Sequence, residues 1–400
     1  MSAGQRNSQA ARPRVLAVAS HPIQYQVPWF RALTQSARFD FSVLFIQLPD
    51  AKQQGHGFGV AFEWDIPLLD GYRWTQASHV NGPGGFDGFF AARLGSPLKL
   101  LRDSKADVVL LTGWHIWPLI QLLVAARWLG IPVIMRGESN ALRPRGFLAR
   151  TWHRLLLGRC AAMLPIGKAS HAFYAGYGIE EQQLFDAPYF VDNARFASAA
   201  AQWAPQQAAL REAWNIPADA ACFLYAGKLE PKKRILDLLA ALAAMKTTTK
   251  PVHLLVVGSG ELKDEALAFV AAHDLPVTFA GFLNQSEIGK AYACADCLVL
   301  PSDFGETWGL VVNEAMASGL PAIVSDRVGC APDLITDGAT GFVFPFGDTA
   351  ALAAHMTRTA AEPQHLPAMG AQARERVLRN YGVQNAVDAT IRAVDHVLKR

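Results

Sequence analysis

The chain has 400 residues, a formal net charge of +3, and a composition that is 51% hydrophobic and 18% charged. At roughly 100–200 residues per domain, this length indicates two or three domains, and the composition excludes a disordered chain. The charge is too small to indicate a nucleic-acid-binding protein.

Five cysteines are scattered along the chain and do not form a disulfide framework, which favours a reducing, cytoplasmic location. Cys294 and Cys297, in "ACADC", have the spacing of a redox or zinc pair, but no second pair or nearby histidine completes such a site. We therefore expect neither a metal nor a cofactor.

The first residues, "MSAGQRNSQAARPR", are polar and basic and contain no secretory signal. We expect residues 1–13 to be a disordered tail. The runs "RVLAVAS", "FSVLFIQ", "DVVLLTG" and "IPVIMRG" then alternate with segments of helical spacing. Runs that are apolar throughout and separated by helices indicate parallel strands buried on both faces. Residues 14–200 are thus predicted to form an N-terminal Rossmann-like domain.

One uncharged stretch, Val108–Ala126, is long enough for a membrane-spanning helix. Four residues interrupt it: Gly113, His115, Pro118 and Gln121. A strand over Val108–Leu111, a turn, and a helix that ends near Gly130 account for this stretch better than a membrane span.

From about Ala197 to Ala221 the composition shifts to alanine and glutamine, as in a connector. A second series of strand-like runs follows, from "CFLYAGKL" to "GFVFPFGD". We predict a second doubly wound α/β domain over residues 201–378 and a C-terminal helix over 379–400. Ligands of such sheets lie beyond the carboxyl ends of the strands, so two facing domains would form one shared cleft.

The strand end "YAGKLEPKKRILDLL" carries several basic residues directly before a helix: Gly227 is followed by Lys228, Lys232, Lys233 and Arg234. Backbone amides at a helix N-terminus together with lysines form an anion site suited to phosphate. A solvated basic turn is the alternative. In "VVGSGE", Gly258 and Gly260 allow a ligand to approach the backbone, but Lys263 replaces the third glycine of a dinucleotide fingerprint.

The stretch "FGETWGLVVNEAMASGLP" contains two glutamates, Glu306 in a loop and Glu314 in the predicted helix. Unpaired glutamate is rarely buried, because desolvating the carboxylate is costly. A carboxylate can accept hydrogen bonds from vicinal hydroxyls, which sugars and ribose carry. The pair therefore indicates a site that binds hydroxyl groups beside the phosphate donors.

Three segments in this order, "GKLEPKK", "PSDFGETWGLVVNEAMASGLPAIVSD" and "DGATGFVFPFGD", resemble the retaining glycosyltransferases of family 4, which have the GT-B fold. "SHPIQYQVPWFRAL" and "PYFVDNARF" in the first half are also similar to that family. The resemblance covers nearly the whole chain beyond the tail.

The resemblance implies that Lys228 and Lys233 bind the donor diphosphate, that Glu314 holds the ribose and that Glu306 approaches the transferred sugar. It also implies a set of donor-side residues around the sugar and phosphates: Gly227, Gly258, Gly260, Phe282, Thr307, Trp308, Gly309 and Leu310.

The chain departs from the family pattern at two places. Lys228 stands where arginine is common, which loses a bidentate contact to phosphate. After "VIMRGES", where many members have a histidine, this chain has Arg136, Glu138 and Ser139. Glu138 is a further catalytic candidate, and His115 is either a substitute for that histidine or a packed loop residue. The acceptor side of the cleft is expected to include His21, Gln24, Tyr25 and Arg136.

The segment "RPRGFLARTWHRLLLGR" alternates basic residues with Leu, Phe and Trp, which is compatible with peripheral contact at the inner face of a membrane. Ordinary packing on the sheet is the alternative.

Together these features predict a hexosyltransferase-type glycosyltransferase that moves a sugar from a nucleotide diphosphate-sugar to a saccharide or lipid-linked hydroxyl acceptor. Retention of configuration is implied by the resemblance. No Asp-x-Asp motif occurs, so no metal is indicated. The alternatives are a nucleotide-sugar epimerase on the same scaffold and a non-catalytic nucleotide-sugar-binding protein.

Overall fold

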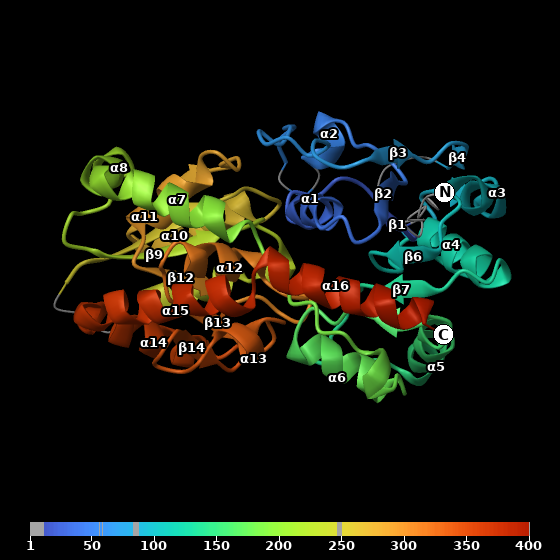
Figure 1. The fold of residues 1–400 in the computed structure, drawn as a ribbon. Helices are drawn as coiled ribbons and strands as arrows, with labels where there is room; N and C mark the ends of the chain where they lie inside the picture. Colours follow the sequence, from blue (N-terminus) through green and yellow to red (C-terminus); the bar gives the residue numbers. More distant parts are fainter. Residues whose placement is uncertain (1–11, 56, 58, 83–87, 246–249, 400) are drawn as a thin grey trace, which may run out of the picture.

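The computed structural model describes residues 12–55, 57, 59–82, 88–245 and 250–399, and Figure 1 shows them as two α/β halves joined side by side. Most of the tail expected over residues 1–13 lies outside the described residues. Residues 56, 58 and 83–87, in two glycine-containing loops of the first half, also lie outside the described residues.

The first half is built on a six-stranded parallel sheet with the order β3-β2-β1-β6-β7-β8. Its strands are β1 Arg14–Ala19, β2 Asp40–Phe45, β3 Trp74–Gln76, β6 Val108–Leu111, β7 Val133–Met135 and β8 Ala162–Met163. Its helices are α1 Val27–Gln35, α2 Ala51–Gln54, α3 Pro97–Ser104, α4 Trp117–Trp128, α5 Phe147–Leu157 and α6 Lys168–Gly176. A short antiparallel pair, β4 Val80–Asn81 and β5 Arg93–Leu94, lies outside this sheet.

The second half repeats the same topology, with the strand order β11-β10-β9-β12-β13-β14. Its strands are β9 Ala221–Ala226, β10 Val252–Val257, β11 Val277–Gly281, β12 Cys297–Leu300, β13 Ala322–Ser325 and β14 Gly341–Phe344. Its helices are α9 Ile235–Ala243, α10 Lys263–His273, α11 Ile288–Cys294, α12 Leu310–Ala317, α13 Ala331–Leu334, α14 Thr349–Ala361 and α15 Leu366–Asn380. Both orders are those of a doubly wound Rossmann sheet, so the predicted fold class is confirmed.

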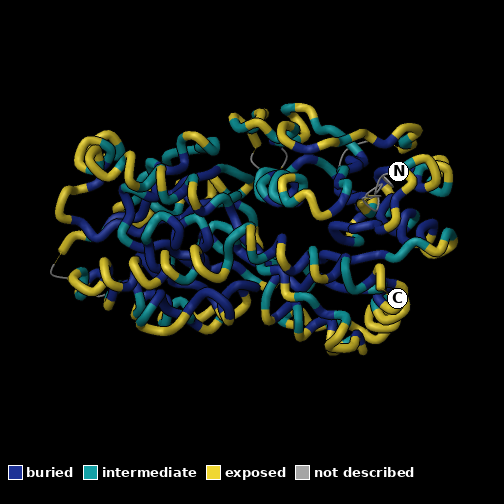
Figure 2. The backbone as a smooth tube through the Cα atoms, viewed as in Figure 1, coloured by how far each residue is buried: buried dark blue, intermediate teal, exposed yellow. Residues whose placement is uncertain are grey.

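The central strands are mostly apolar because helices cover both faces of each sheet. All four residues of Val108–Leu111 are fully buried, and all six of Ala221–Ala226 are buried as well (Figure 2). Val108–Ala126 forms β6 and most of α4, so the prediction of a strand, a turn and a helix is confirmed. Within the described ranges, no helix is long and apolar enough to cross a membrane.

Two helical segments connect the halves. The alanine-rich connector is helical: α7 Asn193–Trp203 packs against α11 and α12 of the second half, and α8 Gln207–Ala213 packs against α11. The predicted C-terminal helix is α16 Val383–Leu398, which returns to the first half and packs against α1 (Figure 1). The chain end thereby contributes to the core of the domain in which the chain began.

The cysteines are free and buried. Burial raises the pKa of the Cys294 thiol to about 11, so this thiol stays protonated and unreactive at neutral pH. In the part of the chain that the structure describes, no group of three or more His, Cys, Asp and Glu side chains could hold a metal ion.

Candidate functional site

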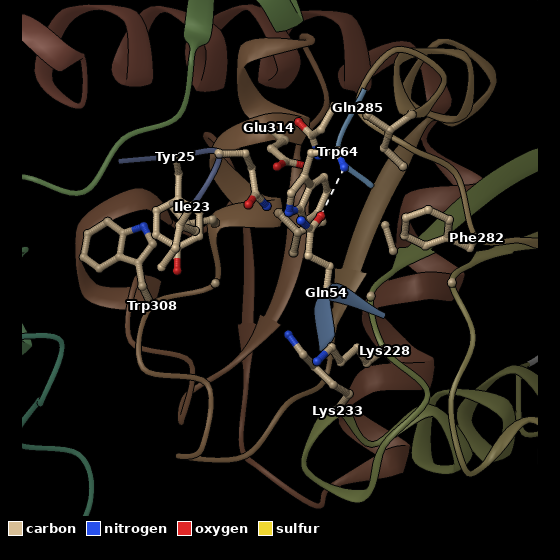
Figure 3. Close-up of a pocket in the computed structure, with 18 of the residues that line it drawn as sticks. Ile23, Tyr25, Gln54, Trp64, Lys228, Lys233, Phe282, Gln285, Trp308 and Glu314 are labelled. Atoms are coloured by element: carbon tan, nitrogen blue, oxygen red, sulfur yellow. Dashed lines mark hydrogen bonds between the residues drawn. The ribbon is translucent and has the colours of Figure 1, made fainter. Parts of the chain in front are cut away.

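A cavity of about 740 Å³ lies between the two halves, next to the carboxyl ends of strands from both sheets. Its wall includes most of the residues singled out from the sequence: His21, Gln24, Tyr25, Glu138, Gly227, Lys228, Lys233, Gly258, Phe282, Glu306, Thr307, Trp308, Gly309, Leu310 and Glu314. Figure 3 shows Lys228 and Lys233 at one end of this cavity and Glu314 on its far side. Both halves are therefore needed to complete the cavity.

One end of the cavity carries three lysines held by the turn after β9: Lys228, Lys232 and Lys233. Lys228 follows the strand after Gly227, and Lys233 ends a 3-10 turn over Pro231–Lys233. Lys233 forms an ion pair with Glu306, and the side chains of the two residues are 16% and 14% exposed, respectively. This pair brings the predicted phosphate-binding residue and the predicted sugar-binding residue into direct contact.

The N-terminus of α12 is open at the same cavity. Gly309 precedes the helix with a φ of 99°, and a β-carbon there would lie 2.9 Å from atoms of both Leu300 and Val328, so glycine is required. Among the described residues, the amides of Leu310 and Val311 have no backbone acceptor. Together with the helix dipole, these free amides favour an anion.

The two glycines after β10 have a different role from the one expected. A β-carbon on Gly258 would lie 1.9 Å from the Gly227 carbonyl oxygen, and one on Gly260 would lie 2.5 Å from the Leu229 carbonyl oxygen. Both glycines thus allow close approach of the neighbouring loop of the protein itself. Gly258 also lines the cavity, whereas Gly260 is not part of its wall.

Glu314 is the most deeply placed carboxylate of the site. Its Oε2 accepts a hydrogen bond of 2.6 Å from the Tyr292 hydroxyl, and burial raises its pKa against the opposing effects of that bond, Arg195 and Lys233. Only one oxygen has a side-chain donor among the described residues. A ligand hydroxyl that donates to the other oxygen would stabilise the ionised form.

Glu138 joins the two halves across the cavity. It accepts hydrogen bonds from the Tyr189 hydroxyl of its own half and, at 3.2 Å, from Thr307 Oγ1 of the other. Asn140 Nδ2 donates to the Thr307 carbonyl oxygen at 3.0 Å. These bonds hold the loop that follows β7 against the loop that carries Glu306.

His21 and His115 lie near each other on the first-half side, His21 partly buried and His115 with an exposed edge. Burial and the nearby His115 lower the pKa of His21 to about 4, and Ser20 Oγ lies 2.9 Å from its Nδ1. Partial desolvation also lowers the pKa of His115, although Glu138 opposes this shift. His21 lines the cavity, whereas His115 folds back to within 2.9 Å of a β-carbon position on Gly113 and is not part of the wall.

The His21 shift predicts a loss of stability in mild acid. The unfolded histidine titrates near 6.5, so as the pH falls from 6.5 toward about 4 the unfolded chain binds the proton first. The part of the free energy of unfolding that depends on a neutral His21 is fully present above pH 6.5, and about 2 kcal/mol of it should be lost at pH 5. Urea unfolding at pH 7 and pH 5 measures this, and His21→Gln should show a smaller drop. The exposed His365→Gln is the control, and an equal drop in all three proteins would contradict the assignment.

Arg136 differs from the expected arrangement. Arg136 was expected on the acceptor side of the cleft, but it is 6% exposed and absent from the cavity wall, and it donates to the Ala187 carbonyl oxygen at 2.7 Å. Its guanidinium lies over the Trp29 and Tyr189 rings. Trp308 touches the cavity, but its indole is 3% exposed and donates to Asn313 Oδ1 at 2.7 Å. Both side chains are buried behind the cavity wall and support it.

The structure adds cavity residues that the sequence did not indicate: Ile23, Gln54, Trp64, Tyr189 and Gln285. Trp64 comes from a first-half segment that reaches the second half, where the Phe62 ring packs at a tilt against Phe282 with 4.3 Å between ring centroids. Asn284 Nδ2 donates to the Glu63 carbonyl oxygen at 2.7 Å. No motif marks this segment, because its position depends on contacts between residues about 220 apart in the chain.

Comparison with known proteins gives a family match for the second half. Residues 206–376 match the model of the family described as "Glycosyl transferases group 1". The match includes the lysines after β9 and both glutamates, but not the first-half wall of the cavity.

Two curated proteins are similar in sequence. Glycogen synthase of Mycobacterium tuberculosis is 31% identical over 169 residues, which span 42% of this chain and 40% of that protein. D-inositol 3-phosphate glycosyltransferase of Nocardioides is 28% identical over 312 residues, 69% of this chain and 67% of that protein. The first alignment thus spans only about two fifths of the mycobacterial protein.

A solved structure agrees over nearly the whole chain. The Anabaena protein Alr3699/HepE in complex with UDP has a TM-score of 0.70 at 16% identity, covering 97% of this chain and 99% of that one. At this identity the likeness establishes the fold, with two Rossmann-like domains facing a shared cleft, and it includes the first half that the family match leaves out.

Proposed function

We propose that this chain is a glycosyltransferase of group 1 that transfers a hexose from a nucleoside diphosphate-sugar to a hydroxyl acceptor. The observation that carries the proposal is one cavity that combines the lysines after β9, the open N-terminus of α12, and two carboxylates suited to hydroxyl groups. The family match and the curated relatives support the same activity.

The phosphate end of the cavity supplies the electrostatics that the reaction needs. When the bond between the sugar and the diphosphate breaks, negative charge develops on the departing diphosphate. Lys233 and the free amides of Leu310 and Val311 can stabilise that charge, with Lys228 beside them. Since Lys233 pairs with Glu306 in the ligand-free structure, the diphosphate would compete with Glu306 for this lysine.

We assign the second carboxylate, Glu314, to the ribose hydroxyls and Glu306 to the transferred sugar. Glu314 lies deep in the second half with one oxygen bonded to Tyr292, which leaves the other for a ribose hydroxyl. Glu306 lies between Lys233 and the first half, where the acceptor would enter. His21, Tyr25 and Glu138 line that first-half side and would contact the acceptor.

We further propose that transfer proceeds with retention, as in family 4. The acceptor oxygen bonds to the anomeric carbon on the face from which the diphosphate departs with the bonding electron pair, and the acceptor proton passes to a phosphate oxygen. The support is the resemblance of the motifs. The anomeric configuration of the product, read by NMR, tests it independently of the activity.

A thermal-shift screen of nucleoside diphosphate-sugars, followed by a transfer assay, tests the proposal. A ligand that binds only the native state adds about 2.7 kcal/mol to the free energy of unfolding when its concentration is a hundred times Kd. The melting temperature rises accordingly. We expect a shift with the donor and product formation only when the acceptor is added. An epimerase would convert the donor alone, and a non-catalytic binder would show the shift without product. Either result would contradict the proposal and favour the corresponding alternative.

A further inference from the structure

Helix α5 presents an apolar strip to solvent. Its large apolar side chains are Phe147 (81% exposed), Leu148 (83%), Trp152 (48%) and Leu155 (55%). Their spacing follows the helical repeat, so they share one side of the helix. Leu156 and Leu157, in the last turn of the helix, are buried in the core of the first half. Figure 1 places α5 beside the C-terminus mark, and in the same view Figure 2 colours the helix at that place mainly as exposed.

The charged residues in α5 and next to it in the sequence are all basic. Five arginines lie on or beside the helix: Arg143, Arg145, Arg150, Arg154 and Arg159. No acidic residue occurs between Glu138 and Glu180 in the sequence. Arg145 and Arg159 donate to backbone carbonyl oxygens, and the partly buried Arg145 also lies over the Phe173 ring. Within the described ranges no carboxylate pairs with any of the five, so the charge of the four exposed arginines is available to an anionic partner.

The segment that leads into α5 contacts the loop beside the cavity. The Arg143 guanidinium lies 5.7 Å from the centre of the Phe304 ring, and Phe304 is in the loop that carries Glu306. Asn140, in the same segment, donates a hydrogen bond to the Thr307 carbonyl oxygen of that loop. The first half thus carries both the exposed helix and the segment that contacts the Glu306 loop.

We propose that the α5 face, defined by Phe147, Leu148, Trp152 and Leu155 and the five arginines, docks on an anionic lipid bilayer. Apolar side chains of a surface helix enter the interface, while neighbouring arginines bind lipid phosphates. The apolar strip of α5 matches the acyl region of such a bilayer, and the basic residues beside it match the anionic headgroups. Docking in this way holds the first half at the membrane surface. If the proposed function holds, the acceptor would be a lipid-linked saccharide.

Co-sedimentation with vesicles tests the docking. The full chain should bind vesicles of equimolar phosphatidylglycerol and phosphatidylcholine, should bind phosphatidylcholine alone far more weakly, and should be released by salt. The double variant Phe147→Ser and Leu148→Ser should lower the partition coefficient about tenfold or more. Arg150→Gln and Arg154→Gln should each lower it about fivefold.

Matched controls come from exposed residues of the second half. Leu267→Ser with Leu378→Ser, which are 40% and 44% exposed, and Arg374→Gln should leave vesicle binding unchanged. Nucleoside diphosphate affinity should be unchanged in every variant, which separates failure of the docking from failure of the proposed function. Vesicle binding that is absent at low salt, or equal in the α5 variants and the wild type, would overturn the proposal. So would self-association without lipid that the α5 variants abolish, because that face would then bind a second copy.

Discussion

Replacing Glu306 by alanine should lower transfer by about 100- to 1000-fold, the scale of losing a group that stabilises the transition state, while nucleoside diphosphate affinity stays the same or rises slightly. The affinity is expected to hold because Glu306 pairs with Lys233 in the ligand-free protein, so its removal frees that lysine for the diphosphate. Calorimetry with nucleoside diphosphate and steady-state transfer measure the two effects. Glu306→Gln, which keeps the size and removes the charge, should behave similarly.

The matched comparison is Glu314→Ala, which should weaken free nucleotide and donor alike by about 1–3 kcal/mol, because the ribose is present in both. Tyr292→Phe keeps the carboxylate and removes only its hydrogen-bond donor, so it separates loss of the ligand contact from loss of local support. If Glu306→Ala lost as much nucleotide affinity as Glu314→Ala, both residues would merely brace the loop, and the proposed division of roles would be wrong.

Replacing Lys233 by alanine should weaken nucleoside diphosphate binding by about 1.5–3 kcal/mol, the scale of a charge-assisted hydrogen bond. The single variant also leaves the Glu306 carboxylate without its cation beside the phosphate position. Lys233→Ala with Glu306→Ala should therefore recover part of the lost affinity, because that repulsion disappears.

Lys232→Ala is the control for the Lys233 experiment. Lys232 lies in the same turn, but its side chain is 46% exposed and it pairs with Glu230 at 3.2 Å. We expect a smaller loss of affinity, because an exposed charge is screened by solvent. Unchanged affinity in Lys233→Ala, measured by calorimetry, would remove Lys233 from the phosphate site.

The sequence predicted the fold because strands buried on both faces must be apolar along their whole length. Val108–Leu111 and Ala221–Ala226 show this pattern, and a strand carries it whatever its neighbours are. The connector after residue 197 was harder to assign, because α7 and α8 are rich in alanine and glutamine and owe their positions to contacts with α11. Such packing leaves no periodic signal strong enough to distinguish a helix from a linker.

The second-half wall of the site could also be anticipated, because its residues lie in short segments at strand ends. Lys233 follows β9 and Glu306 follows β12, and the carboxyl ends of neighbouring parallel strands lie at one edge of the sheet. The first-half wall was anticipated only in part, because His21, Gln24, Tyr25 and Glu138 line it as expected whereas Arg136 does not. Arg136 is near the expected segment but points into the core, because the Trp29 and Tyr189 rings enclose its guanidinium.

The sequence by itself determined that two doubly wound domains face each other and that lysines and glutamates of the second meet at the strand ends. Only the tertiary structure decided that Lys233 is paired with Glu306, that Glu138 joins the halves through Thr307, and that α5 leaves its apolar side in solvent. The physical reason is the range of the interactions. Apolar periodicity is a local property of the chain, whereas an ion pair or an exposed face depends on which distant segments pack beside it.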